Sequence, residues 1–239
     1  MHRGLSSNTG TLSITTDSFS TVTDFGPWIT GPSVYFYDRT IERVRSLPQV
    51  ALAADDRLHE LAYATLTAWG MHRMGEGVAT KLTPFDMFRD ALAGLVKEVQ
   101  DLRGLSITNV TAAEAVQLSA RLGQLVLRPG ISSTGAPLVG NAKTLHFILP
   151  DLVPPIDRTY TLRFFFGYMT PPGSPKALFE KVFTPLHRLA LRQADALRGL
   201  AGSYLCGGHA KGLDNAIVGY VLLHGEHFGK ADLAESAEV

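Results

Sequence analysis

The feature that most constrains the fold is the proline pair Pro154-Pro155, which separates two apolar stretches in the middle of the chain. Proline fixes φ and has no amide donor, so the pair makes a stiff, extended connection. An apolar segment with Lys143 and His146 precedes it, and Asp157 follows it at the start of another apolar segment. The sequence therefore predicts two short helices joined by a rigid turn, with Asp157 held in a definite place.

Apolar residues elsewhere recur every three or four positions, which is the period of an α-helix. Thr111 with Glu114 forms the pattern of a capping box, and Thr83-Pro84 and Ser174-Pro175 have the pattern of an N-cap followed by proline. We expect a kink at Pro185 inside the last of these helices. The predicted helices cover about 33–47, 55–69, 84–102, 111–127, 141–149, 158–166, 174–200 and 212–224.

No run of alternating apolar and polar residues is bounded by hairpin turns, and no internal repeat is present. These patterns predict a mostly α, single-domain multi-helix bundle of about eight helices over residues 31–228. Residues 1–30, rich in Ser, Thr and Gly, are expected to form a flexible leader. Residues 229–239 are expected to form an acidic tail.

Composition excludes several classes of function. Lys plus Arg equals Asp plus Glu at 22 each, so the whole chain has no basic field for nonspecific nucleic-acid binding. Between residues 140 and 200, however, the sequence contains eight Lys and Arg residues and four Asp and Glu residues. This local positive charge suits an anionic ligand. The single cysteine, Cys206, excludes an internal disulfide, and no apolar run reaches the roughly 20 residues of a membrane span. We expect a soluble cytoplasmic protein that has no membrane partner and no cofactor, and oligomeric state cannot be read from the sequence.

The segment around the proline pair carries the first candidate site. Lys143 and His146 share a helix face, where they could form a proton-transferring pair beside Asp157; alternatively, Lys143 is solvated and His146 is a structural core residue. Asp157 could act in catalysis or simply cap the next helix, which stabilises it by roughly 1 kcal/mol. Arg158 opposes the helix dipole at that position, and such local conflicts occur at functional sites.

Two other segments are candidates. Trp69, His72 and Arg73 lie at a helix end and in the glycine-containing loop after it, where ligand sites are frequent and where cations also complement helix C-termini. Asp214 or Asn215 is interpreted as the N-cap of the last helix. The pair His224 and His227 lacks further ligands for a metal, so we expect no metal site.

The stretch LVGNAKTLHFILPDLVPPIDRTYTLRFFFG resembles the core of the helix-hairpin-helix DNA glycosylase superfamily. The resemblance places Lys143 at the position of the family's lysine, Asp157 at its essential carboxylate and Arg163 at a basic residue of the next helix. It implies cleavage of an N-glycosidic bond on an extruded base, with Asp157 stabilising the cationic sugar and Lys143 attacking or assisting. The chain has only Gly140 where that family has paired glycines, and it has no cysteine cluster.

Three strings distributed over the chain, WGMHRMG, KTLHFILPDLVPPIDR and LDNAIVGY, are similar to those of an uncharacterised family of bacterial helical proteins. Three hypotheses therefore stay open. The chain is a glycosylase-like protein that acts on or binds nucleic acid. It is a binder or enzyme for a small phosphate- or nucleotide-like anion, on which His72, Arg73, Lys143, His146 and Arg158 converge. Or it is a non-catalytic scaffold or regulatory protein.

Overall fold

The computed structural model describes residues 32–71, 81–132, 137–200 and 207–235, which form one compact, mostly helical domain. β pairing in these ranges consists of an isolated antiparallel bridge between Leu82 and Ser132. The expected leader, residues 1–30, lies outside the described residues. The helices are α2 (Pro32–Ser46), α3 (Gln49–Leu52), α4 (Asp56–Leu66), α5 (Phe85–Glu98), α6 (Ala112–Leu125), α7 (Pro137–Ile148), α8 (Arg163–Phe166), α9 (Pro175–Arg192), α10 (Ala194–Leu200) and α11 (His209–Glu235).

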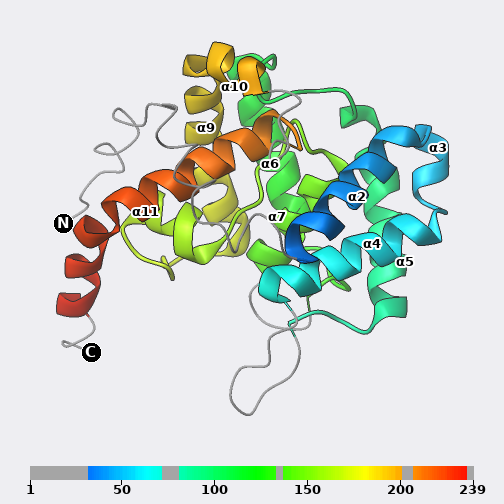
Figure 1. Ribbon diagram of the computed structural model, residues 1–239, viewed down its shortest axis with the longest axis horizontal. Helices are drawn as coiled ribbons and strands as arrows, with labels where there is room; N and C mark the ends of the chain where they lie inside the picture. Colours follow the sequence, from blue (N-terminus) through cyan, green and yellow to red (C-terminus); the bar gives the residue numbers. More distant parts are fainter. Residues whose placement is uncertain (1–31, 72–80, 133–136, 201–206, 236–239) are drawn as a thin grey trace.

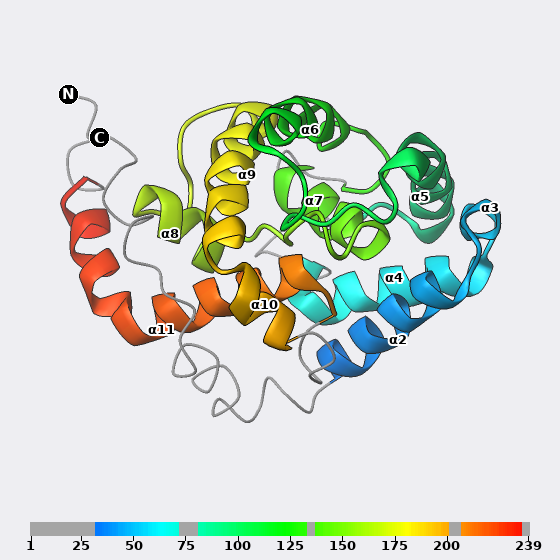
Figure 2. The ribbon, with the colours of Figure 1, turned by 90° about the horizontal axis from the view of Figure 1, so that it is seen from above.

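Helix α7 lies in the middle of the bundle (Figures 1 and 2). It packs against α2, α4 and α5 on one side and against α9 on another. Its residues from 140 to 148 are all buried, because its sequence is apolar around nearly its whole circumference. The segment that the sequence analysis singled out therefore forms the centre of the core.

Two helix pairs enclose α7. Helices α2 and α4 pack together on one side, and α6 and α9 pack together on the other. Gly123 on α6 allows close approach to α9, because a Cβ there would lie 3.3 Å from side-chain atoms of Lys176 and Glu180. The long helix α11 crosses α8 and α9 and contacts the short π-helix η4 (Arg158–Leu162) that precedes α8.

Most predicted helix starts are confirmed by their caps. The Asp55 carboxylate accepts a 2.7 Å hydrogen bond from the Leu58 amide at the start of α4. Thr111 and Glu114 form the predicted capping box of α6. Ser174 caps α9, and Pro175 occupies its first turn.

The prediction that Thr83 caps α5 is wrong. Pro84 is the N-cap residue and provides no side-chain hydrogen bond. The Thr83 hydroxyl instead donates to the carbonyl of Gly130, which lies 47 residues further along the chain. The long-range hydrogen bond to Gly130 therefore takes the place of the expected cap at the start of α5.

Two predicted helices have different bounds in the structure. The helix expected over 174–200 ends at Arg192, and α10 begins after Gln193, while Pro185 is accommodated inside α9. Helix α11 begins at His209, three residues before the expected start, and continues to Glu235, beyond the expected end near His224. Asp214 and Asn215 therefore lie inside this helix, and the prediction that one of them is its N-cap is wrong.

None of the helices in the described residues combines the length and the apolar character needed to cross a membrane.

Candidate functional site

The candidate site is a cluster of two lysines and two aspartates around Trp69. Lys143 lies on α7, in the core, and only 9% of its surface is exposed. Burial lowers the pKa of its ammonium, and the negative charges of Asp157 and then Asp214 oppose that lowering. Among the described residues, no carboxylate lies within 4.0 Å of Lys143 Nζ. An amine in such a place is more readily neutral, and therefore nucleophilic, than a surface lysine.

Trp69 forms a platform for both lysines. It lies in the π-helix η2 (Thr67–Met71), just before Gly70, which has a φ of 77°. Lys143 Nζ lies 5.4 Å from the centroid of the Trp69 ring, and Lys211 Nζ lies 5.7 Å from it. The electron-rich face of an indole attracts cations, and this attraction is stronger where water is excluded.

Asp157 is held as the proline pair predicts. Pro154 and Pro155 are buried and lie outside regular secondary structure. Asp157, just before η4, has an extended backbone with a φ of −130°. Its Oδ1 accepts a 2.7 Å hydrogen bond from the Tyr160 amide, so the residue is an N-cap. Within the described parts of the chain, its other oxygen, Oδ2, has no hydrogen-bond partner. The carboxylate is half-buried, and its charge is the largest single one that acts on Lys143.

Asp214 is the second carboxylate of the cluster, and sequence reasoning missed it. It lies on α11, is 5% exposed, and its Oδ2 accepts a 2.6 Å contact from Lys211 Nζ. Burial raises the pKa of the Asp214 carboxyl, and Lys211 opposes that rise. The signal in the sequence is the spacing Lys211-x-x-Asp214, which places both side chains on one face of an otherwise apolar helix.

His146 serves the core and not the cluster. Its Nδ1 donates a 2.7 Å hydrogen bond to the Val153 carbonyl, so its Nε2 is the acceptor for the Tyr37 hydroxyl at 2.9 Å. Burial lowers the pKa of His146 to about 3, which keeps the ring neutral. Both ring nitrogens are thus engaged within the protein. Tyr37 also packs on Trp69, with ring centroids 5.3 Å apart, so His146 orients Trp69 indirectly.

The remaining predicted site residues are only partly assembled. Arg158 is exposed beside Asp157, and Arg163 lies half-buried on α8. His72 and Arg73 lie outside the described residues. The structure therefore brings together Trp69, Lys143 and Asp157 of the predicted set and adds Lys211 and Asp214 to them.

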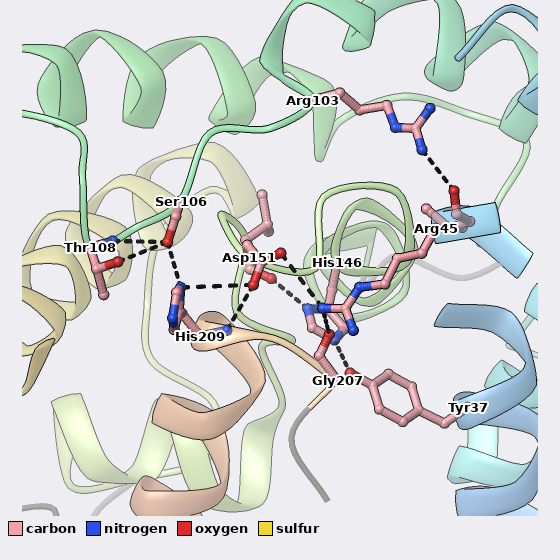
Figure 3. Close-up of polar contacts among 11 residues, drawn as sticks. Tyr37, Arg45, Arg103, Ser106, Thr108, His146, Asp151, Gly207 and His209 are labelled. Atoms are coloured by element: carbon pink, nitrogen blue, oxygen red, sulfur yellow. Dashed lines mark hydrogen bonds and ion pairs between the residues drawn. The ribbon is translucent and has the colours of Figure 1, made fainter. Parts of the chain in front are cut away.

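A second polar group, with Ser106, Asp151 and His209, lies at the start of α11 (Figure 3). It lies beside a surface hollow of about 140 Å³ that is lined by residues including Arg45, Arg103 and Asp151. Ser106 Oγ lies 2.8 Å from His209 Nδ1, and Asp151 Oδ1 lies 3.8 Å from the same nitrogen. Because Ser106 and Asp151 approach one ring nitrogen, the group lacks the relay of a catalytic triad. Asp151 instead accepts the His209 amide at 3.0 Å and caps α11.

Comparisons with protein-family models, curated proteins and solved structures give no match for the chain. In the part of the chain that the structure describes, no three His, Cys, Asp or Glu side chains are grouped so that they could hold a metal ion.

Proposed function

We propose that this chain is an enzyme that acts on nucleic acid, with the Lys143 amine as nucleophile toward a sugar carbon and Asp157 as the carboxylate that stabilises the cationic sugar. The observation that carries the proposal is the position of Lys143, a nearly buried amine over Trp69 with two carboxylates nearby and none in direct contact among the described residues. Burial favours the neutral amine, which is the reactive form, although the two carboxylates partly oppose this effect.

The reaction requires an exchange of bonds at the anomeric carbon. The Lys143 nitrogen forms a bond to that carbon as the glycosidic C–N bond breaks, and the base leaves with the bonding electrons and takes up a proton. One of the two amine protons balances the proton taken up by the base, and the other passes to the ring oxygen as the C–O bond of the sugar ring breaks, which leaves a neutral Schiff base. A carboxylate such as Asp157, with one oxygen fixed by the Tyr160 amide, offers its charge to the developing cation at little reorganisation cost.

The balance of charge in the cluster favours this chemistry over the capture of a small anion. Lys211 is paired with Asp214, and a neutral Lys143 carries no charge, so the cluster has no surplus cation for a phosphate. The exposed cations near it are Arg158, which follows Asp157, and Lys81, whose charge acts on Lys143. Such exposed residues suit the phosphate backbone of a nucleic acid outside the cluster.

Trapping of the Schiff base with borohydride tests the proposal. The chain is incubated with duplex and single-stranded DNA that carry an abasic site, and the covalent adduct is measured on denaturing gels. We expect an adduct with the unchanged chain and a loss of at least about tenfold with Lys143→Gln. Lys181→Gln, which changes an exposed lysine on α9, is the matched control and should retain the adduct.

Two results would contradict the proposal. One is an adduct of equal yield from Lys143→Gln, which would indicate reaction of surface lysines with the aldehyde. The other is the absence of both adduct formation and salt-dependent DNA binding at low ionic strength. The second result would favour a scaffold, in which the buried charges serve only the fold.

A further inference from the structure

Two lysines, one buried (Lys143) and one half-buried (Lys211), share one tryptophan but differ in their partners. Lys143 and Lys211 lie 5.4 and 5.7 Å from the centroid of Trp69, one from α7 and the other from α11. Lys211 Nζ contacts Asp214 Oδ2 at 2.6 Å. Lys143, by contrast, has no carboxylate within 4.0 Å among the described residues.

Like charges close together in a site with little water repel, so the cluster favours states in which one of the two amines is neutral. The 2.6 Å contact with Asp214 gives Lys211 a direct counter-ion. The same contact occupies the carboxylate that Lys143 would otherwise approach.

We propose that Lys211 adds to the effect of burial in keeping Lys143 neutral, by placing a second positive charge beside the same tryptophan and by holding the Asp214 carboxylate. Lys211 is therefore a positioning residue that acts through Lys143. This inference gives a regulatory partner to the amine of the proposed function and rests on it for its biological meaning. The protonation states themselves are a property of the folded chain and can be measured without any substrate.

The other charged or titratable groups around Lys143 either favour or oppose its charged form, or are themselves uncharged. Asp157 favours the charged form of Lys143, and Lys81 opposes it. Burial, and after it the charges of Asp157 and Asp214, raise the pKa of the Tyr160 hydroxyl, so it is uncharged at neutral pH. His146 is neutral because its pKa is about 3. Lys211 is half-buried, and removal of its positive charge should change the Lys143 titration.

NMR titration of the ¹³Cε signals of the lysines tests the inference in the full chain. The Lys143 and Lys211 signals are assigned by their loss in Lys143→Arg and Lys211→Arg. In the unchanged chain, Lys143 should lose its proton at a lower pH than an exposed lysine does. A Lys143 midpoint at or above that of the exposed lysines would overturn the inference, and this measurement depends on no variant that changes the charge of the cluster.

Two substitutions at Lys211 separate charge from structure. Lys211→Gln removes the cation but keeps a hydrogen-bond donor for Asp214, and it should raise the midpoint of Lys143 by on the order of one pH unit. Lys211→Arg keeps the cation and should leave that midpoint near its original value. A folded Lys211→Gln chain with an unchanged Lys143 midpoint would overturn the inference.

The two proposals fail in different ways. If Lys211→Gln raises the midpoint of Lys143 but no Schiff base forms with abasic DNA, the proposed function is wrong and the coupling stands. If the Schiff base forms but Lys211→Gln leaves the pH profile of adduct formation in place, the coupling is wrong. If both hold, the adduct profile of Lys211→Gln should move to higher pH in parallel with the NMR midpoint.

Discussion

The hydroxyl of Tyr37 donates a 2.9 Å hydrogen bond to Nε2 of His146, a residue 109 positions away, and the two rings stack with centroids 5.7 Å apart. This contact joins α2 to the central helix α7 and places Tyr37 against Trp69. The aromatic platform of the candidate site thus depends on a buried hydrogen bond between two elements far apart in sequence.

Tyr37→Phe should lower the free energy of unfolding by about 1–3 kcal/mol, because it leaves the buried Nε2 of His146 without a donor. Chemical denaturation measured at neutral pH checks this value. Tyr35→Phe is the matched control, since Tyr35 is 59% exposed on the same helix and should change stability little. Equal effects of the two changes would contradict the role given to this hydrogen bond.

Gly207→Ala should disturb the hydrogen bond between Tyr37 and His146, because Gly207 lies against the Tyr37 hydroxyl. A Cβ at Gly207 would lie 2.1 Å from the Tyr37 hydroxyl oxygen, so the tyrosine would have to move. We expect destabilisation of about 1–3 kcal/mol, typical of overpacking, in thermal or chemical unfolding. Gly199→Ala is the control: Gly199 lies in α10 with open space around its Cβ position, so alanine should stabilise the helix by up to about 1 kcal/mol.

Two buried histidines should respond to substitution with opposite signs. His59 is 2% exposed, and neither of its ring nitrogens has a hydrogen-bond partner among the described residues. His59→Leu should therefore stabilise the protein, by about 1 kcal/mol or more, because it removes an unsatisfied polar group. His187, whose Nε2 bonds to the Val110 carbonyl at 2.9 Å, should give the reverse result with leucine. Denaturation curves of the two variants give the change in the free energy of unfolding for each, and changes of the same sign would contradict this prediction.

Acid should destabilise the fold before the carboxylates titrate. Burial lowers the pKa of His146 from 6.5 to about 3, and it also lowers the pKa of His59. The unfolded chain then binds more protons than the folded chain below pH 6.5, so the free energy of unfolding falls as pH falls from there toward 3. Each such histidine contributes a slope of up to about 1.4 kcal/mol per pH unit. Denaturation at several pH values should show a smaller slope for His59→Leu, whereas an unchanged slope would contradict the lowered pKa of His59.

Local signals in the sequence predicted most helices, but they did not predict the hydrogen bonds to distant residues that replace some of the expected local caps. The capping box of Thr111 and Glu114 is confirmed because all its atoms lie within one turn. Thr83 has the same kind of pattern, yet its hydroxyl bonds to Gly130, and α11 begins three residues early because Asp151, 58 residues away, caps His209. Partners that only the tertiary fold brings together cannot be read from local spacing.

The same limit applies to the candidate site. The proline pair correctly indicated that Asp157 is held at the start of a helix, since stiffness is a local property. Asp214 was taken for a cap because its helix was expected to begin at Gly212. Its approach to Lys143 depends on how α11 crosses the bundle, which no spacing within α11 encodes.

Substitution of Asp157 separates its two roles. Asn at this position still accepts the Tyr160 amide as an N-cap, whereas it carries no charge to stabilise the cationic, protonated Schiff base that Lys143 would form with an abasic sugar. We therefore expect Asp157→Asn to unfold within about 0.5 kcal/mol of the unchanged chain and to lose adduct formation with abasic DNA by roughly 10²-fold or more. Asp157→Ala should lose adduct formation and also about 1 kcal/mol of stability, because it loses the cap as well. Unfolding curves and borohydride trapping on the same preparations give both quantities. An Asp157→Asn chain that forms the adduct at the original rate would show that this carboxylate serves the helix alone.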